Sequence, residues 1–284
     1  MPSIEEEGWD LVIEPKKSIF SLDLKALWKY RDLLVLFVKR DFKSSYKQTV
    51  LGPLWFLIQP ILTTITFLVI FGRIAKTAPQ DLPAILFFMS GIVLWNYYAE
   101  CLVKTSDTFV SNKGMFGKVY FPRLIVPISI VISNLVRLLI QLLLFTCFWI
   151  YFYIDGANIH INSTVLLLPF LILLMAGHGL ALGIIISSMT TKYRDLKFLI
   201  QFGIQLLMYA SPVVYPLSKV PEQYHWMLML NPMTSIIETF KYSVLGQGVH
   251  EPFYLLLNFL LLCLLLFLGM LVFNKVERSF MDTV

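Results

Sequence analysis

Charge is scarce in this chain. Charged residues make up 14% of its 284 residues, hydrophobic residues make up 57%, and the mean hydropathy is +0.73. Soluble domains carry about 25% charged residues, which their water-facing surfaces need. This deficit excludes a water-soluble globular protein and predicts a polypeptide that crosses a membrane several times.

Cysteines, histidines and nucleotide-binding motifs offer no catalytic site. The three cysteines, Cys101, Cys147 and Cys263, lie in apolar runs without CxxC spacing, which argues against disulfides or zinc and favours small buried side chains. The four histidines lack metal-ligand spacing, and the string at 114–118 has the wrong spacing for a phosphate-binding GxxxxGK loop. We therefore expect no enzymatic activity, cofactor or metal in this chain, and no nucleic-acid partner.

Long apolar runs are what the chain does have. A helix needs about 20 apolar residues to cross a hydrocarbon core of roughly 30 Å. The sequence therefore predicts an all-α integral membrane protein with six transmembrane helices between polar tails at 1–23 and 275–284. The six runs are 53–74, 83–103, 124–153, 165–189, 197–216 and 252–274.

The distribution of Lys and Arg orients these spans. Cytoplasmic loops collect basic residues close to the membrane. With both termini inside and the third run taken as one span, eighteen basic residues fall inside, four fall outside, and Arg137 lies within the span. Splitting the third run would move Lys192, Arg194, Lys197 and the C-terminus outside, so a single span with both termini cytoplasmic is favoured.

Two of the spans carry residues that indicate helix contacts. Gly179 and Gly183 form a GxxxG pattern, which lets two helices approach closely. An ionised side chain inside a span is costly, so Arg137 should face a partner helix or a water-filled channel.

The segment 226–246 does not fit a simple loop. It is long enough to cross, yet it contains Asn231-Pro232, Glu238 and Lys241. Proline breaks the helical hydrogen-bond ladder, and irregular backbone at membrane depth is tolerated only inside protein or beside water. We interpret the segment as a broken, re-entrant pair of short helices entering from the outer face; an amphipathic loop on the outer surface is the alternative.

Residues 24–47 predict an amphipathic helix that lies in the membrane interface. Its basic face carries Lys25, Lys29, Lys39, Lys43 and Lys47, and its apolar face carries Leu27, Tyr30, Leu34, Phe37 and Val38. The Gly52-Pro53 pair then predicts an elbow between this helix and the first span, because the missing N–H of Pro53 is harmless in a first helical turn.

Five strings occur in one order over nearly all of the chain after residue 20, and together they resemble the transmembrane subunits of ABC-type polysaccharide exporters, which move O-antigen, capsule or teichoic-acid chains. The strings are RDLLVLFVKRDFKSSYKQTVLGPLWFLIQPILTT (31–64), GKVYFPRLIVP (117–127), TKYRDLKFLIQF (191–202), ASPVVYPLSKVP (210–221) and LNPMTSIIETFKYSVLG (230–246).

This resemblance implies partners. Such subunits form a homodimer with the channel between protomers, and two copies of a separate ATPase subunit bind ATP and Mg at the cytoplasmic face. The substrate is a polymer assembled on a polyprenyl diphosphate lipid and threaded outward. The expected location is the bacterial cytoplasmic (inner) membrane, in contact with its lipids.

The resemblance also implies roles for particular positions. The residues expected to contact the ATPase are Lys39, Arg40, Asp41, Lys43, Lys113, Gly117, Arg123, Arg194 and Asp195. The outer gate falls on Asn231, Pro232 and Glu238. The chain departs from the family at Arg137, where the family often carries an acid.

Aromatic residues, 15% of the chain, have two uses in this setting. Their faces can stack loosely on sugars, whereas Trp and Tyr also anchor helices at membrane interfaces. The residues predicted to line a channel are Trp95, Tyr97, Tyr98, Arg137, Gln201, Gln205, Tyr209 and Tyr215, with anchoring as the alternative for each ring.

The function expected from these features is that of a channel-forming subunit of an ATP-driven exporter of polyprenyl-diphosphate-linked polysaccharide. Two alternatives stay open. One is an ABC permease for a drug or small lipid. The other is a polytopic membrane transferase for polyprenyl-linked sugars, which would need acidic or histidine clusters that the loops do not show.

Overall fold

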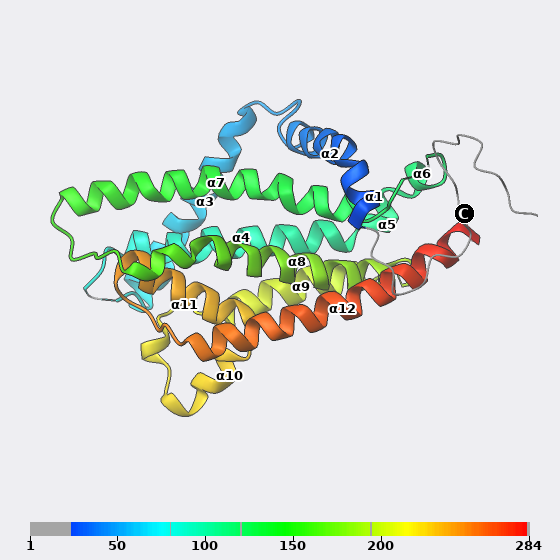
Figure 1. Cartoon of the computed structure of the whole chain (residues 1–284). Coiled ribbons are helices and arrows are strands. Elements are labelled where there is room, and N and C mark those ends of the chain that lie inside the picture. The colour runs from blue at the N-terminus through cyan, green and yellow to red at the C-terminus, as the bar shows by residue number, and fades with distance from the viewer. Residues whose placement is uncertain (1–23, 80, 120, 194, 283–284) are drawn as a thin grey trace, which may run out of the picture.

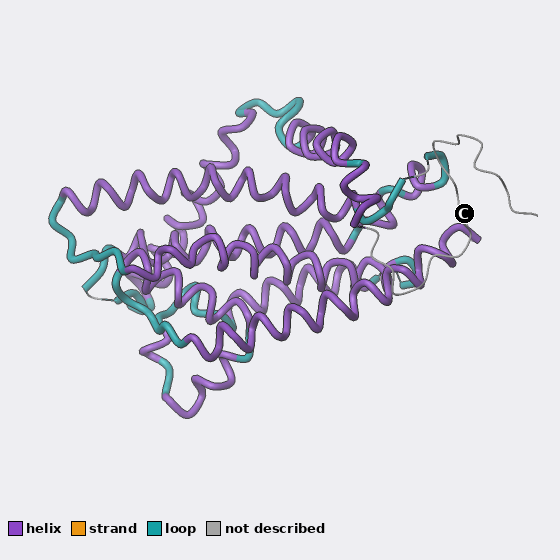
Figure 2. The backbone as a smooth tube through the Cα atoms, in the orientation of Figure 1, coloured by secondary structure: helices purple, strands orange, loops and turns teal. Residues whose placement is uncertain are grey.

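The computed structural model describes residues 24–79, 81–119, 121–193 and 195–282, and these form helices joined by short loops (Figures 1 and 2). The predicted N-terminal tail and Arg194 lie outside the described residues. The C-terminal tail predicted from residue 275 is not set apart from the last span, because helix α12 continues through it to Asp282.

Five helical segments are long and apolar enough to cross a membrane. Most of them run side by side as an elongated bundle, and the first, Gly52–Ile74, runs obliquely to the others (Figure 1). Their bounds are Gly52–Ile74 (containing α3, Trp55–Phe67), α4 Ala84–Ser106, α7 Ile125–Ile154, Ser163–Thr190 (containing α8, Leu168–Thr190) and Pro252–Val276 (within α12, Pro252–Asp282). The third predicted run is one continuous helix, as the distribution of basic residues indicated.

Helix α4 is the centre of the bundle. In its most apolar stretch 78% of the residues are buried, against 22% in the stretch of Gly52–Ile74. It packs against α8 at the predicted GxxxG face, where a Cβ atom on Gly179 would lie 2.8 Å from the Cβ of Cys101 and one on Gly183 would lie 2.5 Å from the Cβ of Thr105. Only glycine permits this separation, so the predicted close contact is confirmed.

The predicted span at 197–216 is not a single helix of spanning length. Helix α9 covers Leu196–Tyr209, and its 14 residues rise about 21 Å, short of the roughly 30 Å hydrocarbon core. A proline disfavours helical backbone at the residue before it, and Ser211 precedes Pro212. A sixth crossing helix is therefore not among the described helices that have the length of a span.

The region before α12 is a broken helix pair, as predicted. Helix α10 covers His225–Met229 and α11 covers Pro232–Leu245, with the break at the Asn231-Pro232 pair. The side chain of Asn231 caps α11 by accepting a hydrogen bond from the backbone N–H of Met233 at 3.1 Å. Helix α11 is buried over most of its length against the bundle.

The predicted helix at 24–47 is two helices. Helix α1 covers Leu24–Lys29 and α2 covers Arg31–Ser44, with a break at Tyr30 that no proline or glycine marks. The elbow follows: Gly52 has φ +55°, a conformation that favours glycine, and Pro53 opens the next helical turn. Helix α2 packs against α7, across the end of the bundle (Figure 1).

Candidate coupling site at the basic end

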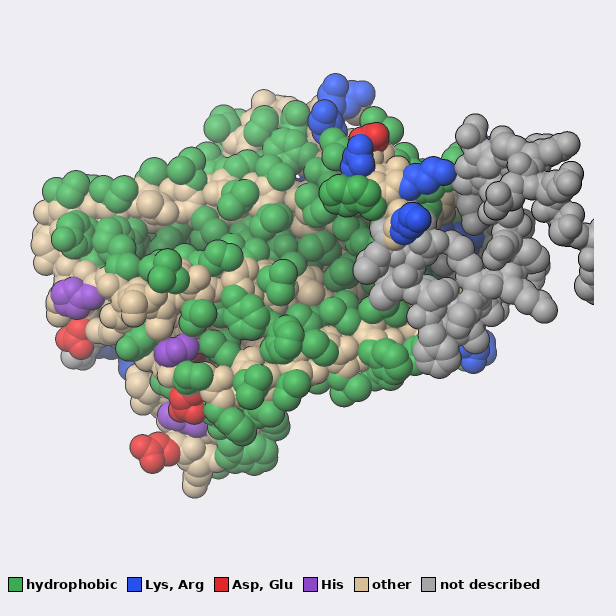
Figure 3. Space-filling view, viewed as in Figure 1, with side chains coloured by type: hydrophobic (Ala, Val, Ile, Leu, Met, Phe, Trp, Pro, Cys, Tyr) green, Lys and Arg blue, Asp and Glu red, His purple; other side chains and the backbone are tan. Residues whose placement is uncertain are grey.

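The two ends of the bundle differ in charge. We call the end that carries α1, α2 and the loops 107–124 and 190–195 the basic end, and the other end the opposite end (Figure 1). Lys and Arg side chains gather over α2 and its surroundings, whereas Asp, Glu and His are more visible at the opposite end (Figure 3). The orientation predicted from the sequence would place the basic end on the cytoplasmic side.

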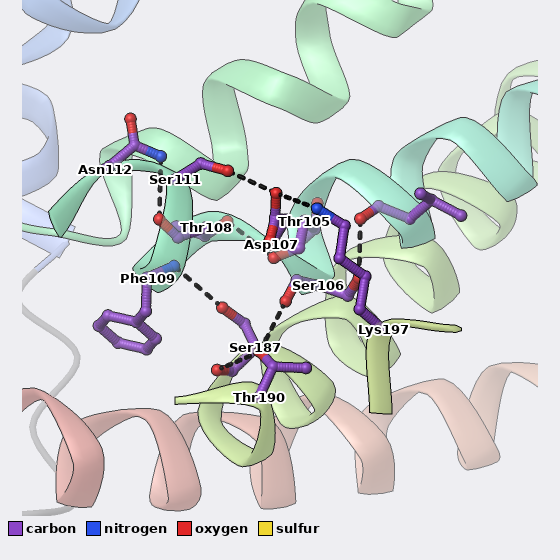
Figure 4. A network of polar contacts seen from close by, with 11 residues as sticks. Thr105, Ser106, Asp107, Thr108, Phe109, Ser111, Asn112, Ser187, Thr190 and Lys197 are labelled. Carbon is purple, nitrogen blue, oxygen red and sulfur yellow. Dashed lines mark hydrogen bonds and ion pairs between the residues drawn. The ribbon is translucent and has the colours of Figure 1, made fainter. Parts of the chain in front are cut away.

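Hydrogen bonds tie both loops of the basic end together (Figure 4). Asp107, which follows α4, accepts a hydrogen bond from Nζ of Lys197 on α9 at 2.8 Å. Thr190 at the end of α8 donates its hydroxyl to the backbone carbonyl of Ser106 at 3.0 Å. The hydroxyl of Ser187 accepts from the backbone N–H of Phe109 at 3.2 Å, where the short helix α5 (Thr108–Ser111) begins. These bonds join the start of the loop 107–124 to the two helices that flank the loop 190–195.

Aromatic side chains form a second core at this end. The rings of Phe37 on α2 and Phe121 have centroids 5.7 Å apart, and those of Phe109 and Phe273 are 4.9 Å apart. All four side chains are buried in one cluster. Helix α2, the loop 107–124 and α12 thus share one packed contact, which is separate from the larger core around α4.

Arg137 joins α2 to the bundle. Its guanidinium donates to the hydroxyl of Ser45 just after α2, lies 3.4 Å from Oε2 of Glu100 on α4, and stands 5.0 Å from the ring centroid of Phe56. Glu100 also pairs with Lys104 one turn along α4. A base at this position therefore has an acid facing it from another helix.

A small cavity surrounds Arg137. It has a volume of about 180 Å³ and is lined by residues of α3, α4 and α7, among them Tyr97, Asn134 and Gln141. The structure thus brings together two residues predicted to line a channel, Tyr97 and Arg137. Both residues belong to the same chain.

The other residues predicted to line a channel are divided. Trp95 and Tyr98 are 3% and 1% exposed and pack edge to face in the core around α4, so they do not face a lumen in this structure. Gln201, Gln205 and Tyr209 are exposed along α9, and Tyr215 is half-buried after it. Only the residues of α9 stand where a partner or substrate could meet them.

The residues that the resemblance assigns to ATPase contact nearly all lie at the basic end. Lys39, Arg40 and Lys43 are exposed on α2, and Asp41 pairs with Arg40 at 2.8 Å. Lys113, Gly117 and Asp195 are exposed in the two loops, whereas Arg123 is buried with its guanidinium carbon 5.5 Å from the ring centroid of Phe116. Sequence reasoning missed Asp107, Ser187 and Thr190, because their partners are distant in sequence and single polar residues carry no pattern.

One pair of charged residues at the opposite end is buried. Glu238 and Lys241 on α11 are 2% and 1% exposed, with Nζ of Lys241 3.8 Å from Oε1 of Glu238 and 2.5 Å from the carbonyl oxygen of Pro212. Asn231 donates to the hydroxyl of Ser211 at 2.7 Å, so the loop after α9 is fixed to α11 at two points.

Comparison with known proteins places the chain in a family. Residues 32–245 match the family described as ABC-2 type transporter, so the chain belongs to the ABC-2 membrane family and is an integral membrane protein. It is 25% identical to the O-antigen export system permease protein RfbA of Klebsiella pneumoniae, over 88% of this chain and 94% of that protein.

Two further relatives are similar over most of their length. The O-antigen export system permease protein RfbA of Myxococcus xanthus is 28% identical over 77% of this chain and 82% of its own. The polysialic acid transport protein KpsM of Escherichia coli is 22% identical over 86% of this chain and 93% of its own. These relatives cover both ends of the bundle.

Proposed function

We propose that this chain is the channel-forming membrane subunit of an ATP-driven exporter of polyprenyl-diphosphate-linked polysaccharide. The observation that carries the proposal is the similarity to named O-antigen and polysialic acid transport proteins along most of the chain. ATP and Mg bind to a separate ATPase subunit, two copies of which dock on the basic end, which is the cytoplasmic end.

The exposed side of α9 supports a homodimer with the channel between protomers. Ile204 is the one described residue of this helix that is buried, while Phe198, Leu199 and Phe202 are more than half exposed. The amides of Gln201 and Gln205 lie among these apolar side chains, and amides facing lipid alone would lack hydrogen-bond partners. A second copy of the chain, or a wet channel that holds sugar, would supply them.

The transmembrane path has six crossings in this proposal. Helix α9 together with 210–216 makes the fifth crossing, and the α10–α11 pair re-enters from outside as an outer gate that includes Asn231, Pro232 and Glu238. Both termini are cytoplasmic. The break at Asn231-Pro232 and the burial of α11 support the re-entrant arrangement, because irregular backbone at membrane depth must be enclosed by protein.

Coupling follows from the contacts of the basic end. An ATPase bound to α2 and the loop 107–124 would contact elements that share the buried aromatic cluster. Movement of these elements would also displace Arg137 and the ion pair between Asp107 and Lys197. Closure of the ATPase dimer on ATP would bias the bundle between two arrangements, which is how binding at one place moves another.

The testing experiment is purification with the ATPase encoded beside this chain, followed by reconstitution. We expect a stoichiometric complex whose ATP hydrolysis rises with lipid-linked polysaccharide and not with the polyprenyl lipid alone. If no ATPase co-purifies, or if hydrolysis ignores the glycan, the polysaccharide assignment is wrong.

A further inference from the structure

A second cavity lies at the opposite end of the bundle, away from the contacts of the basic end. It has a volume of about 340 Å³, enclosed by α4, α11 and the loops around Pro79, Pro216 and Gly248. Ligand pockets in proteins measure about 300–1,000 Å³, so this one has room for a single ring-sized ligand.

The two buried charges of α11 line this cavity. Oε2 of Glu238 accepts a hydrogen bond from the backbone N–H of Val249 at 3.2 Å. Oε1 of Glu238 is buried and has no hydrogen-bond partner among the described residues, and the ammonium nitrogen of Lys241 lies 3.8 Å from it. A buried polar atom without a partner is costly, so Glu238 presents an oxygen that a ligand hydroxyl would satisfy.

The loop beside Glu238 is shaped to leave the cavity open. Gly248 has φ +142°, and a Cβ atom there would lie 2.6 Å from the carbonyl oxygen of Glu238. Only glycine lets the loop press this closely on α11. As a result Val249 reaches the carboxyl group and Gln247 lines the cavity.

The polar lining is electrically balanced. Glu238 and Asp81 supply two acids, Lys241 and Lys219 supply two bases, and Gln247 and Ser218 add neutral donors and acceptors. A charged ligand would leave one of these charges facing a like charge. A hydroxyl group can both donate and accept a hydrogen bond, and so suits every one of them.

We propose that this cavity binds one neutral sugar ring. Hydroxyl groups of the sugar donate to Oε1 of Glu238 and bond to the amide of Gln247, and the ring lies against the apolar wall that Pro216 provides. That the sugar belongs to the exported polymer rests on the proposed function. The binding itself does not.

The test measures binding of methyl glycosides to the full chain with its ATPase in lipid nanodiscs, without ATP, by saturation-transfer NMR. The probes are the neutral methyl glycosides of glucose, mannose, galactose and N-acetylglucosamine, compared with glucuronate and glucosamine. We expect at least one neutral glycoside to bind, with dissociation constants about tenfold higher for glucuronate and glucosamine. Equal binding of charged and neutral sugars would overturn the ligand class.

Two variants locate the site. Glu238→Gln should raise the dissociation constant of the neutral glycoside about tenfold, and Gln247→Ala, on a loop where folding is less at risk, should raise it about threefold. Glu222→Gln, an exposed carboxylate at the same end, is the matched control and should leave binding unchanged. Absence of binding to the wild type, or unchanged binding in both cavity variants, would overturn the proposal.

Export measured with the same complex reconstituted into closed vesicles separates the two proposals. Polymer export without glycoside binding would overturn the sugar site and leave the proposed function standing. Glycoside binding that depends on Glu238, without polymer export, would support the sugar site and overturn the proposed function.

Discussion

The basic end and the opposite end hold their charges in different ways. At the basic end, ion pairs join separate helices and are partly exposed: the side chains of Asp107 and Lys197 are 22% and 43% exposed, and those of Arg137 and Glu100 are 15% and 46% exposed. At the opposite end, Glu238 and Lys241 lie on one helix, and their side chains are 3% and 2% exposed.

This difference decides which end can move. A partly exposed pair contributes about 0–1 kcal/mol, because water takes over when it opens. Breaking a fully buried pair costs about 3–5 kcal/mol, because a desolvated charge is left behind. The basic end is therefore built from contacts that can exchange partners, whereas the opposite end holds α11 and the loop after α9 in place. The predictions below test this comparison.

The largest effect is expected from reversing the charge of α2. With Lys39, Arg40 and Lys43 all replaced by Glu, the six charge units lost should turn attraction into repulsion and abolish co-purification of the ATPase. These side chains are exposed, so the chain should still insert and fold. The alanine triple variant should be intermediate. Export at the wild-type level by the glutamate variant would exclude α2 as the docking element.

The next effect is on stability at the opposite end. Lys241→Met leaves Glu238 buried without its partner and should lower the free energy of unfolding by about 3 kcal/mol. This is the lower end of the range, since Glu238 keeps its hydrogen bond from the backbone N–H of Val249. Combining it with Glu238→Gln should recover most of the loss. Thermal unfolding in detergent measures the stability of the single and the double variant. If the losses from the two substitutions simply add, Glu238 and Lys241 do not stabilise each other.

A smaller effect is expected where Arg137 joins α2 to α4. Arg137→Met removes charge-assisted hydrogen bonds worth about 1.5–3 kcal/mol, so α2 should become more accessible and export per ATP should fall about tenfold. Hydrogen exchange over residues 31–45 and a coupled export assay provide the readouts. Arg73→Met, an exposed arginine at the opposite end, is the control. Hydrogen exchange that is unchanged in both variants would show that Arg137 does not hold α2 against the bundle.

The smallest effect on stability is expected at Asp107. Asp107→Asn weakens the bond to Lys197 but should change the free energy of unfolding by less than about 1 kcal/mol. Because this bond ties the two loops together, stimulation of ATP hydrolysis by substrate should fall although the fold persists. Asp155→Asn, exposed at the opposite end, is the control. A marked loss of stability with intact stimulation would reverse the comparison between the ends.

Much of the fold was predictable because hydrophobic length and the distribution of basic residues report directly on membrane crossing. The continuous α7, the contact at Gly179 and Gly183 and the break at Asn231-Pro232 all followed from local chemistry. The early end of α9 also had a local signal in Ser211-Pro212, which apolar length outweighed.

The remainder depends on contacts between distant residues. Nothing in the sequence marks the break at Tyr30. The partners of Asp107 and Phe109 lie 90 and 78 residues away, so their network emerges only when α8 and α9 return to the basic end. Trp95 and Tyr98 looked suitable for a channel by residue type, but the central position of α4 buries them.

The most direct test of the account is transport into inverted membrane vesicles that contain this chain and its ATPase. Lipid-linked polysaccharide and ATP are supplied outside, and polymer protected from added glycosidase is measured with time. The account predicts protected polymer that requires ATP and is absent with the α2 charge-reversal variant. Equal protection with and without ATP, or none with the wild-type complex, would contradict it.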